Sequence, residues 1–141
     1  IASELAGKIN NLKSLQANIE DAEHNTTRFV VMAQNTLIPS PDSGPLMTTF
    51  VFRVRNVPAA LYKAMGGFAT NGVNMTKLES YQIGGHFSAT QFYADVEGHP
   101  EHGNVRLALE ELGFFTKEVK IIGVYPAHPF RQKNGIVDSE D

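Results

Sequence analysis

Two successive cycles of strand and amphipathic helix in residues 48–125 constrain the fold of this chain more than any other feature of its sequence. In the first cycle, residues 48–55 alternate between apolar and polar, which predicts a half-buried strand. Asn56 can cap the helix that follows, Pro58 suits its first turn, and Gly72 ends it. The apolar stripe of this helix consists of Leu61, Ala64, Met65 and Phe68.

The second cycle begins with a hairpin. Residues 73–83 and 86–97 are predicted strands joined by Gly84-Gly85, a two-residue hairpin signal. Pro100 opens a second helix, Gly113 ends it, and residues 114–125 form a fourth strand. The stripe of the second helix consists of Val105, Ala108, Leu109 and Leu112. The order β-α-β-β-α-β predicts a ferredoxin-like α+β fold, in which a four-stranded antiparallel sheet carries both helices on one face.

The residues on either side of this core are less regular. Apolar residues at Ile1, Leu5 and Ile9 predict a helix within residues 1–10, and residues 28–34 resemble a buried strand. Residues 35–47 contain three of the seven prolines, which is typical of a linker. We therefore predict four parts: an N-terminal segment at 1–36, a linker at 37–47, a domain at 48–126 and a loose tail at 127–141.

Composition argues against several classes of partner. The net charge is −3, whereas nucleic acids and anionic membranes favour a basic surface. The chain has no cysteine, which excludes disulfides and thiolate metal sites and fits a reducing cytoplasm. No apolar run reaches the roughly 18 residues of a membrane-spanning helix. The first residues, from Ile1 on, contain neither a starting methionine nor the pattern of a signal peptide. We therefore expect that the chain was cut from a longer protein.

The junction between the first strand and the first helix is one candidate binding site. The free backbone N–H groups and the dipole of a helix N-terminus suit a carboxylate. The junction runs from Arg55 to Leu61, and its candidate binding residues are Asn56, Val57, Pro58, Ala59, Ala60 and Leu61. A second candidate lies along the next strand, at Asn74, Met75, Thr76, Glu79 and Ser80. The alternatives are a capped helix without a ligand and a solvated strand face.

Two further patterns carry polar groups. Thr27-Arg28-Phe29 combines a hydroxyl donor with a cation that can form a fork with a carboxylate; the alternative is a strand entry with a hydroxyl bonded locally to backbone. His99 and His102 have a spacing that suggests metal binding, but no third ligand is near in sequence and Pro100 disturbs the geometry. We therefore expect neither a metal nor a cofactor.

The chain resembles the prephenate dehydratase family in two separate places. The stretch "NVPAALYKAMGGFATNGVNMTKLES", followed by "FYADVEGH", "ALEEL" and "KIIGVYP", is similar to the ACT domain of that family. Upstream, "NIEDAEHNTTRFVVMA" is similar to the end of the catalytic domain, whose Thr-Arg-Phe motif falls on Thr27, Arg28 and Phe29. The sequence departs from the family at Ala59, where glycine is usual, and at Tyr81-Gln82, where the family has Arg-Pro after Glu79-Ser80.

The resemblance implies a C-terminal fragment of a lyase that converts prephenate to phenylpyruvate, carbon dioxide and water, with residues 1–36 as the helix and strand remnant of its α/β catalytic domain. Thr27 would donate to the leaving hydroxyl and Arg28 would hold a carboxylate. The fragment alone is expected to be inactive, because the rest of that site is absent. The ACT domain would bind L-phenylalanine for feedback inhibition at Asn56–Leu61, Asn74–Thr76 and Glu79-Ser80, between the two subunits of a homodimer, with a tetramer as the larger assembly.

Two other classes remain open at this stage. An RNA-recognition module shares the β-α-β-β-α-β order, but it would need exposed aromatic residues on the central strands and a basic surface. Phe50 and Phe52 instead share the apolar register of the first strand, and the net charge is negative. A free-standing small-molecule sensor without catalysis is the second alternative, and the Thr-Arg-Phe segment argues against it.

Overall fold

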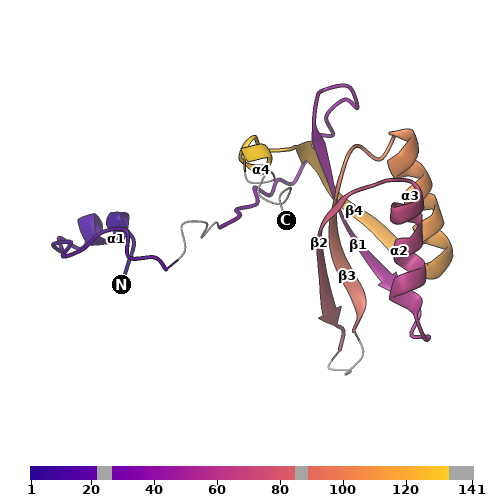
Figure 1. The fold of residues 1–141 in the computed structure, drawn as a ribbon, viewed down its shortest axis with the longest axis horizontal. Coiled ribbons are helices and arrows are strands. Elements are labelled where there is room, and N and C mark those ends of the chain that lie inside the picture. Colours follow the sequence, from indigo (N-terminus) through magenta and orange to yellow (C-terminus); the bar gives the residue numbers. More distant parts are fainter. Residues whose placement is uncertain (22–26, 85–88, 134–141) are drawn as a thin grey trace, which may run out of the picture. The chain divides into compact units, whose positions relative to one another are not determined.

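The chain consists of two compact units in its computed structural model, Ile1–Gln34 and Asn35–Asp141 (Figure 1). The structure describes all residues except 22–26, 85–88 and 134–141. We call the two parts the N-terminal unit and the sheet unit.

The N-terminal unit contains the predicted helix but not the predicted strand. Helix α1 spans Glu4–Ile9, and the side-chain oxygen of Ser3 caps it by accepting a hydrogen bond from the N–H of Ala6 at 3.2 Å. The strand predicted at residues 28–34 is wrong, since residues 27–33 have no regular secondary structure. A strand is stable only beside a hydrogen-bonded partner, and the one sheet in the described part of the chain contains only β1 to β4.

The sheet unit confirms the predicted order of elements. Its strands and helices are β1 Leu46–Val54, α2 Ala60–Thr70, β2 Met75–Gln82, β3 Ala89–Glu97, α3 Gly103–Phe115, β4 Thr116–Pro126 and α4 Phe130–Lys133. The strands lie in the order β2-β3-β1-β4, with every neighbouring pair antiparallel. Helices α2 and α3 pack together on one face of this sheet (Figure 1).

The core lies between this face and the two helices. Phe50 and Phe52 of β1 are fully buried, and Phe52 stacks on Phe92 of β3 with ring centroids 5.2 Å apart. Phe50 stacks on Phe68 of α2 at 5.8 Å. Both predicted helical stripes contribute to this core, so the apolar pattern identified its members correctly. Because Phe50 and Phe52 lie under the helices, they form no exposed aromatic platform on the sheet.

Several predicted boundaries are wrong. Asn56 does not cap α2, because Ala59 occupies the N-cap position. Helix α3 begins at Gly103 rather than Pro100, and it continues through Gly113 to Phe115. The prediction that Gly72 ends the first helix is supported by its positive φ of 62°, just past the C-cap residue Asn71. The turn at Gly84-Gly85 extends outside the described residues.

The predicted linker contains a hydrogen-bonded turn, and its last residues belong to β1. Strand β1 begins at Leu46, inside the predicted linker, and the Leu46 carbonyl accepts a hydrogen bond from the N–H of Gly98 at 2.7 Å. Ser43 closes a turn by donating to the Ser40 carbonyl. Within the predicted loose tail, residues Phe130–Lys133 form the short helix α4. Among the described residues, no helix has the length and apolar content needed to cross a bilayer.

Candidate functional site

A tight turn leads from β1 into α2 and shapes the first candidate site. The N–H of Ala60 donates to the carbonyl of Val57 at 3.2 Å, which closes a turn with Pro58 second and Ala59 third. Ala59 has φ 59° and ψ 22°, in the left-handed region. Proline followed by a residue of positive φ is the arrangement of a type II turn, which favours glycine at the third position. The glycine that the family usually has here therefore matches a backbone requirement that Ala59 meets with strain.

We expect the substitution Ala59→Gly to raise the free energy of unfolding by about 1 kcal/mol, because glycine adopts this backbone conformation without steric cost. This gain in stability is smaller than the full steric cost of placing alanine in the left-handed conformation. Glycine also increases the conformational entropy of the unfolded chain, which offsets part of the gain. Chemical denaturation of both proteins measures the difference. The matched control is Ala69→Gly in the last turn of the same helix, where φ is not positive and loss of helix propensity should lower stability instead. A destabilised Ala59→Gly protein would contradict the assignment.

This turn forms one side of an open pocket with a volume of about 200 Å³. The pocket is lined by Val54, Arg55, Asn56, Val57, Ala59, Ala60, Leu61, Tyr62 and Phe92. Its apolar part includes Phe92, which is 5% exposed and belongs to the core. The pocket therefore joins an apolar floor to the polar N-terminus of a helix.

The polar groups of the pocket favour an anion. Leu61 and Tyr62 lie in the first turn of α2, where a helix supplies no backbone acceptor for their N–H groups. The first intrahelical bond runs from the N–H of Lys63 to the carbonyl of Ala59 at 3.0 Å. The helix dipole adds partial positive charge at this end, and Arg55 is among the residues that line the same pocket. A small molecule with one carboxylate and an apolar side chain would match both parts.

The structure brings together only some of the residues predicted for this site. Of residues 56–61, all except Pro58 line the pocket. Ser80 pairs with Phe92 in the sheet register, which places it beside the pocket floor. Glu79 pairs with Tyr93 and therefore lies on the opposite face of the sheet. Asn74, Met75 and Thr76 lie at the other end of β2, where Met75 pairs with Val96.

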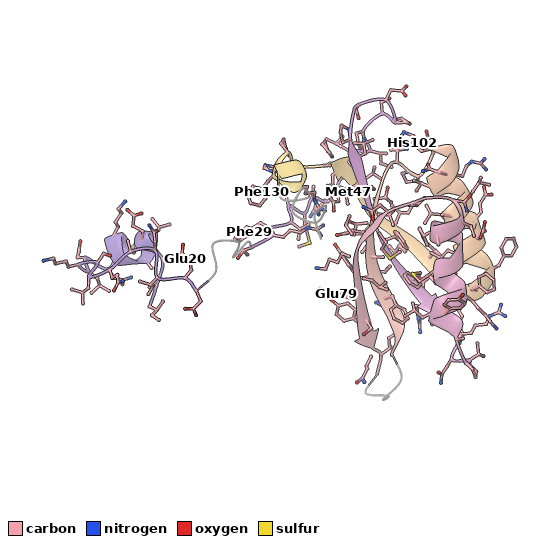
Figure 2. The ribbon with its side chains drawn as sticks, in the orientation of Figure 1. Glu20, Phe29, Met47, Glu79, His102 and Phe130 are labelled. Atoms are coloured by element: carbon pink, nitrogen blue, oxygen red, sulfur yellow. The ribbon has the colours of Figure 1, made fainter. Side chains whose placement is uncertain are left out.

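Glu79 belongs to a separate polar cluster on β2 (Figure 2). Its carboxylate lies 2.9 Å from Nζ of Lys77 and accepts a hydrogen bond from the hydroxyl of Tyr81 at 3.1 Å. The hydrogen bond from Lys77, followed by that from Tyr81, lowers the pKa of Glu79 below its ordinary value. The same bond to Glu79 raises the pKa of Tyr81. Tyr81, which replaces the arginine expected from the family, thus donates to a neighbouring carboxylate.

Thr27, Arg28 and Phe29 lie in the irregular part of the N-terminal unit. All three are exposed, and Phe29 is 87% exposed. None of the three residues lines the pocket at the start of α2. The predicted catalytic role of this motif therefore depends on groups that would have to come from elsewhere.

Sequence reasoning missed three residues that line the pocket: Val54, Tyr62 and Phe92. Two of them directly flank the predicted junction from Arg55 to Leu61, so a wider window would have included them. Phe92 lies on β3, more than thirty positions further along the chain, and reaches the pocket only through pairing of β3 with β1. No local pattern could have assigned it.

The sheet order, the two helices on one face and the pocket at the start of α2 define this part of the chain as a ferredoxin-like α+β domain with room for a small molecule. A family model described as prephenate dehydratase matches residues 1–37. The relatives below extend this likeness over most of the chain. Over most of its length the chain therefore resembles the prephenate dehydratases.

Three known proteins illustrate the relationship. A bifunctional N-acyl-homoserine lactone acylase/prephenate dehydratase of Komagataeibacter europaeus is 56% identical over 133 residues, which are 94% of this chain and 47% of that protein. A bifunctional chorismate mutase/prephenate dehydratase of Aquifex aeolicus is 40% identical, over 89% of this chain and 34% of its own length. The crystal structure of prephenate dehydratase from Arthrobacter aurescens in complex with L-Phe matches with a TM-score of 0.58 and 28% identity, over 66% of this chain and 30% of that one. The chain thus spans between about a third and a half of the curated relatives.

Proposed function

We propose that the sheet unit is the ACT regulatory domain of a prephenate dehydratase and that its pocket binds L-phenylalanine as a feedback inhibitor. The observation that carries this proposal is the pocket itself, in which an apolar floor adjoins the helix N-terminus and Arg55. Phenylalanine has one carboxylate and one aromatic ring to fit these two parts. The Arthrobacter aurescens relative, whose structure is described as a complex with L-Phe, supports the choice of ligand.

Calorimetric titration of this chain with each of the twenty amino acids should give saturable heat with L-phenylalanine. Arg55→Met should weaken that binding about tenfold, because a charge-assisted hydrogen bond to the carboxylate is lost. The matched control is Arg53→Met on the neighbouring part of β1. Arg53 does not line the pocket and instead lies 3.8 Å from Glu118. A flat titration with phenylalanine would refute the effector assignment, and equal losses in both variants would refute the role of Arg55.

We further propose that two copies associate through their sheets into a homodimer, with a tetramer as the larger assembly. Strand β2 is an edge of the sheet, and its residues Leu78 and Tyr81 are 41% and 49% exposed. Antiparallel pairing of two β2 edges would bring Asn74, Met75 and Thr76 of one copy towards the pocket end of the other. Sedimentation of the chain with and without phenylalanine tests this assembly.

For the N-terminal unit, we propose that Thr27, Arg28 and Phe29 contribute to the conversion of prephenate to phenylpyruvate in the cytoplasm. In that reaction the hydroxyl of Thr27 would donate to the departing ring hydroxyl, and Arg28 would bind a carboxylate. Both side chains are exposed here. We therefore expect this chain alone to turn over no prephenate in a phenylpyruvate absorbance assay, and appreciable turnover would mean that the active site is misplaced.

A second candidate activity is hydrolysis of N-acyl-homoserine lactones. It is favoured by the 56% identity to the Komagataeibacter europaeus protein, against 40% to the Aquifex aeolicus one. Mass spectrometry of the chain incubated with such a lactone detects released homoserine lactone. Product would place this activity in the matched half of the relative, and its absence would assign the activity to the part of the relative outside the match.

A further inference from the structure

The two histidines whose spacing resembles a metal site have a different set of partners. Nδ1 of His102 accepts a hydrogen bond from the backbone N–H of His99 at 3.2 Å. Because Nδ1 is an acceptor, the proton of the neutral ring is on Nε2. That Nε2 lies 3.1 Å from the carbonyl oxygen of Pro41, so the ring donates to Pro41. The ring therefore joins the β3–α3 loop to the segment that precedes β1.

His102 occupies the N-cap position of α3 without capping it. Its side chain makes no hydrogen bond to the first turn of the helix, which is the usual task of an N-cap side chain. The ring is directed backwards, to His99 and Pro41, at the start of α3 (Figure 2). His99 supports the same loop from a buried position, with its Nδ1 accepting from the N–H of Glu101 at 3.1 Å. Replacing the ring of His102 therefore removes the tie to Pro41 without removing a cap.

The helix that starts at His102 is in close contact with the helix that forms the pocket. A Cβ atom added at Gly67 of α2 would lie 3.2 Å from the carbonyl oxygen of Ala108 in α3. Asn71 at the end of α2 donates to Glu111 of α3 at 3.1 Å. Backbones packed this closely cannot shift independently. The second half of α2 is therefore tightly packed against α3, which offers a route from the pocket helix to the helix that follows His102.

We propose that His102 is a latch that ties residues 40–45 to the start of α3, and that occupation of the pocket changes the strength of this latch. The first step of this proposal, the tie made by His102, rests on the hydrogen bonds alone. The second step, the effect of the pocket on that tie, rests on the proposed function, since it requires a ligand at the start of α2. Residues 40–45 belong to the sheet unit and directly precede β1, so the latch would carry the state of the pocket to the N-terminal part of this unit.

Hydrogen exchange of the amides of residues 42–44 tests both steps in the full chain. His102→Ala should speed their exchange about fivefold, the factor expected for one lost hydrogen bond, while exchange within β1 stays unchanged. His102→Gln should restore protection, because its amide can donate to Pro41. The matched control His128→Ala replaces an exposed histidine near α4 and should have no effect. Unchanged exchange in His102→Ala would overturn the latch.

The second step is tested by adding L-phenylalanine to the wild-type chain and to His102→Ala. Exchange at residues 42–44 should change with ligand in the wild type and not in the variant, although calorimetry finds binding to both. Binding without any change in exchange would overturn the coupling and leave the proposed function intact. Absence of binding to the wild type would instead refute the proposed function, and the coupling with it, while the test of the first step would stand.

Discussion

Replacing Gly67 by alanine should lower the free energy of unfolding of the sheet unit by about 2 kcal/mol, although alanine is the better helix former. Gly67 is buried where α2 meets α3. A Cβ atom there would lie 2.8 Å from Cβ of Glu111 and 3.2 Å from the carbonyl oxygen of Ala108. The first of these distances is shorter than packed carbon atoms tolerate. The helices would have to separate, which weakens packing along the whole interface.

The adjacent glycine provides the matched control for this experiment. A Cβ atom at Gly66 would have no other atom within 4 Å, and the residue is exposed on the same helix. Gly66→Ala should therefore raise the free energy of unfolding by about 0.5–1 kcal/mol, because only helix propensity changes. Urea denaturation of the two variants measures the direction and size of each change in the free energy of unfolding. If Gly67→Ala were as stable as Gly66→Ala, the close approach of α2 and α3 would be wrong.

The opposite behaviour expected of these neighbouring glycines illustrates what sequence could and could not predict. The 3.6-residue stripe identified which face of α2 is buried, since Leu61, Ala64 and Phe68 all contribute to the core. Periodicity says nothing about how near the next helix lies. Gly67 differs from Gly66 because it packs against Glu111, a residue 44 positions further along the sequence.

The errors at the candidate site have the same origin. A capping role for Asn56 is a reasonable local inference, but the turn closed by Val57 and Ala60 moves the N-cap to Ala59. The strand predicted at residues 28–34 has the composition of a strand, whereas strand formation depends on a partner that the sequence pattern does not identify. The pocket was found because most of its lining is one continuous stretch, and Phe92 was missed because it is not.

The face of the sheet away from the helices holds a buried polar chain that no sequence pattern indicated. Asp95 of β3 is fully buried, and the hydroxyl of Thr49 on β1 donates to its Oδ1 at 2.5 Å. Oγ1 of Thr49 also lies 2.9 Å from the hydroxyl of Tyr125 on β4. Because the single proton of Thr49 is used towards Asp95, Tyr125 must be the donor in the second bond. This series of hydrogen bonds therefore runs from Tyr125 on β4 through Thr49 on β1 to the carboxylate of Asp95 on β3.

Thr49→Val should lower the free energy of unfolding by about 2–4 kcal/mol, since valine keeps the shape of threonine but removes a donor from a buried carboxylate. Tyr125→Phe should cost only about 1 kcal/mol, because it removes the outer donor and leaves the bond to Asp95 in place. Urea denaturation at neutral pH compares the two. The double variant should cost little more than Thr49→Val alone, because the loss of Thr49 already breaks the link to Tyr125. If the two losses of unfolding free energy were fully additive, the two hydroxyls would act separately and would not form one continuous series of hydrogen bonds across the three strands.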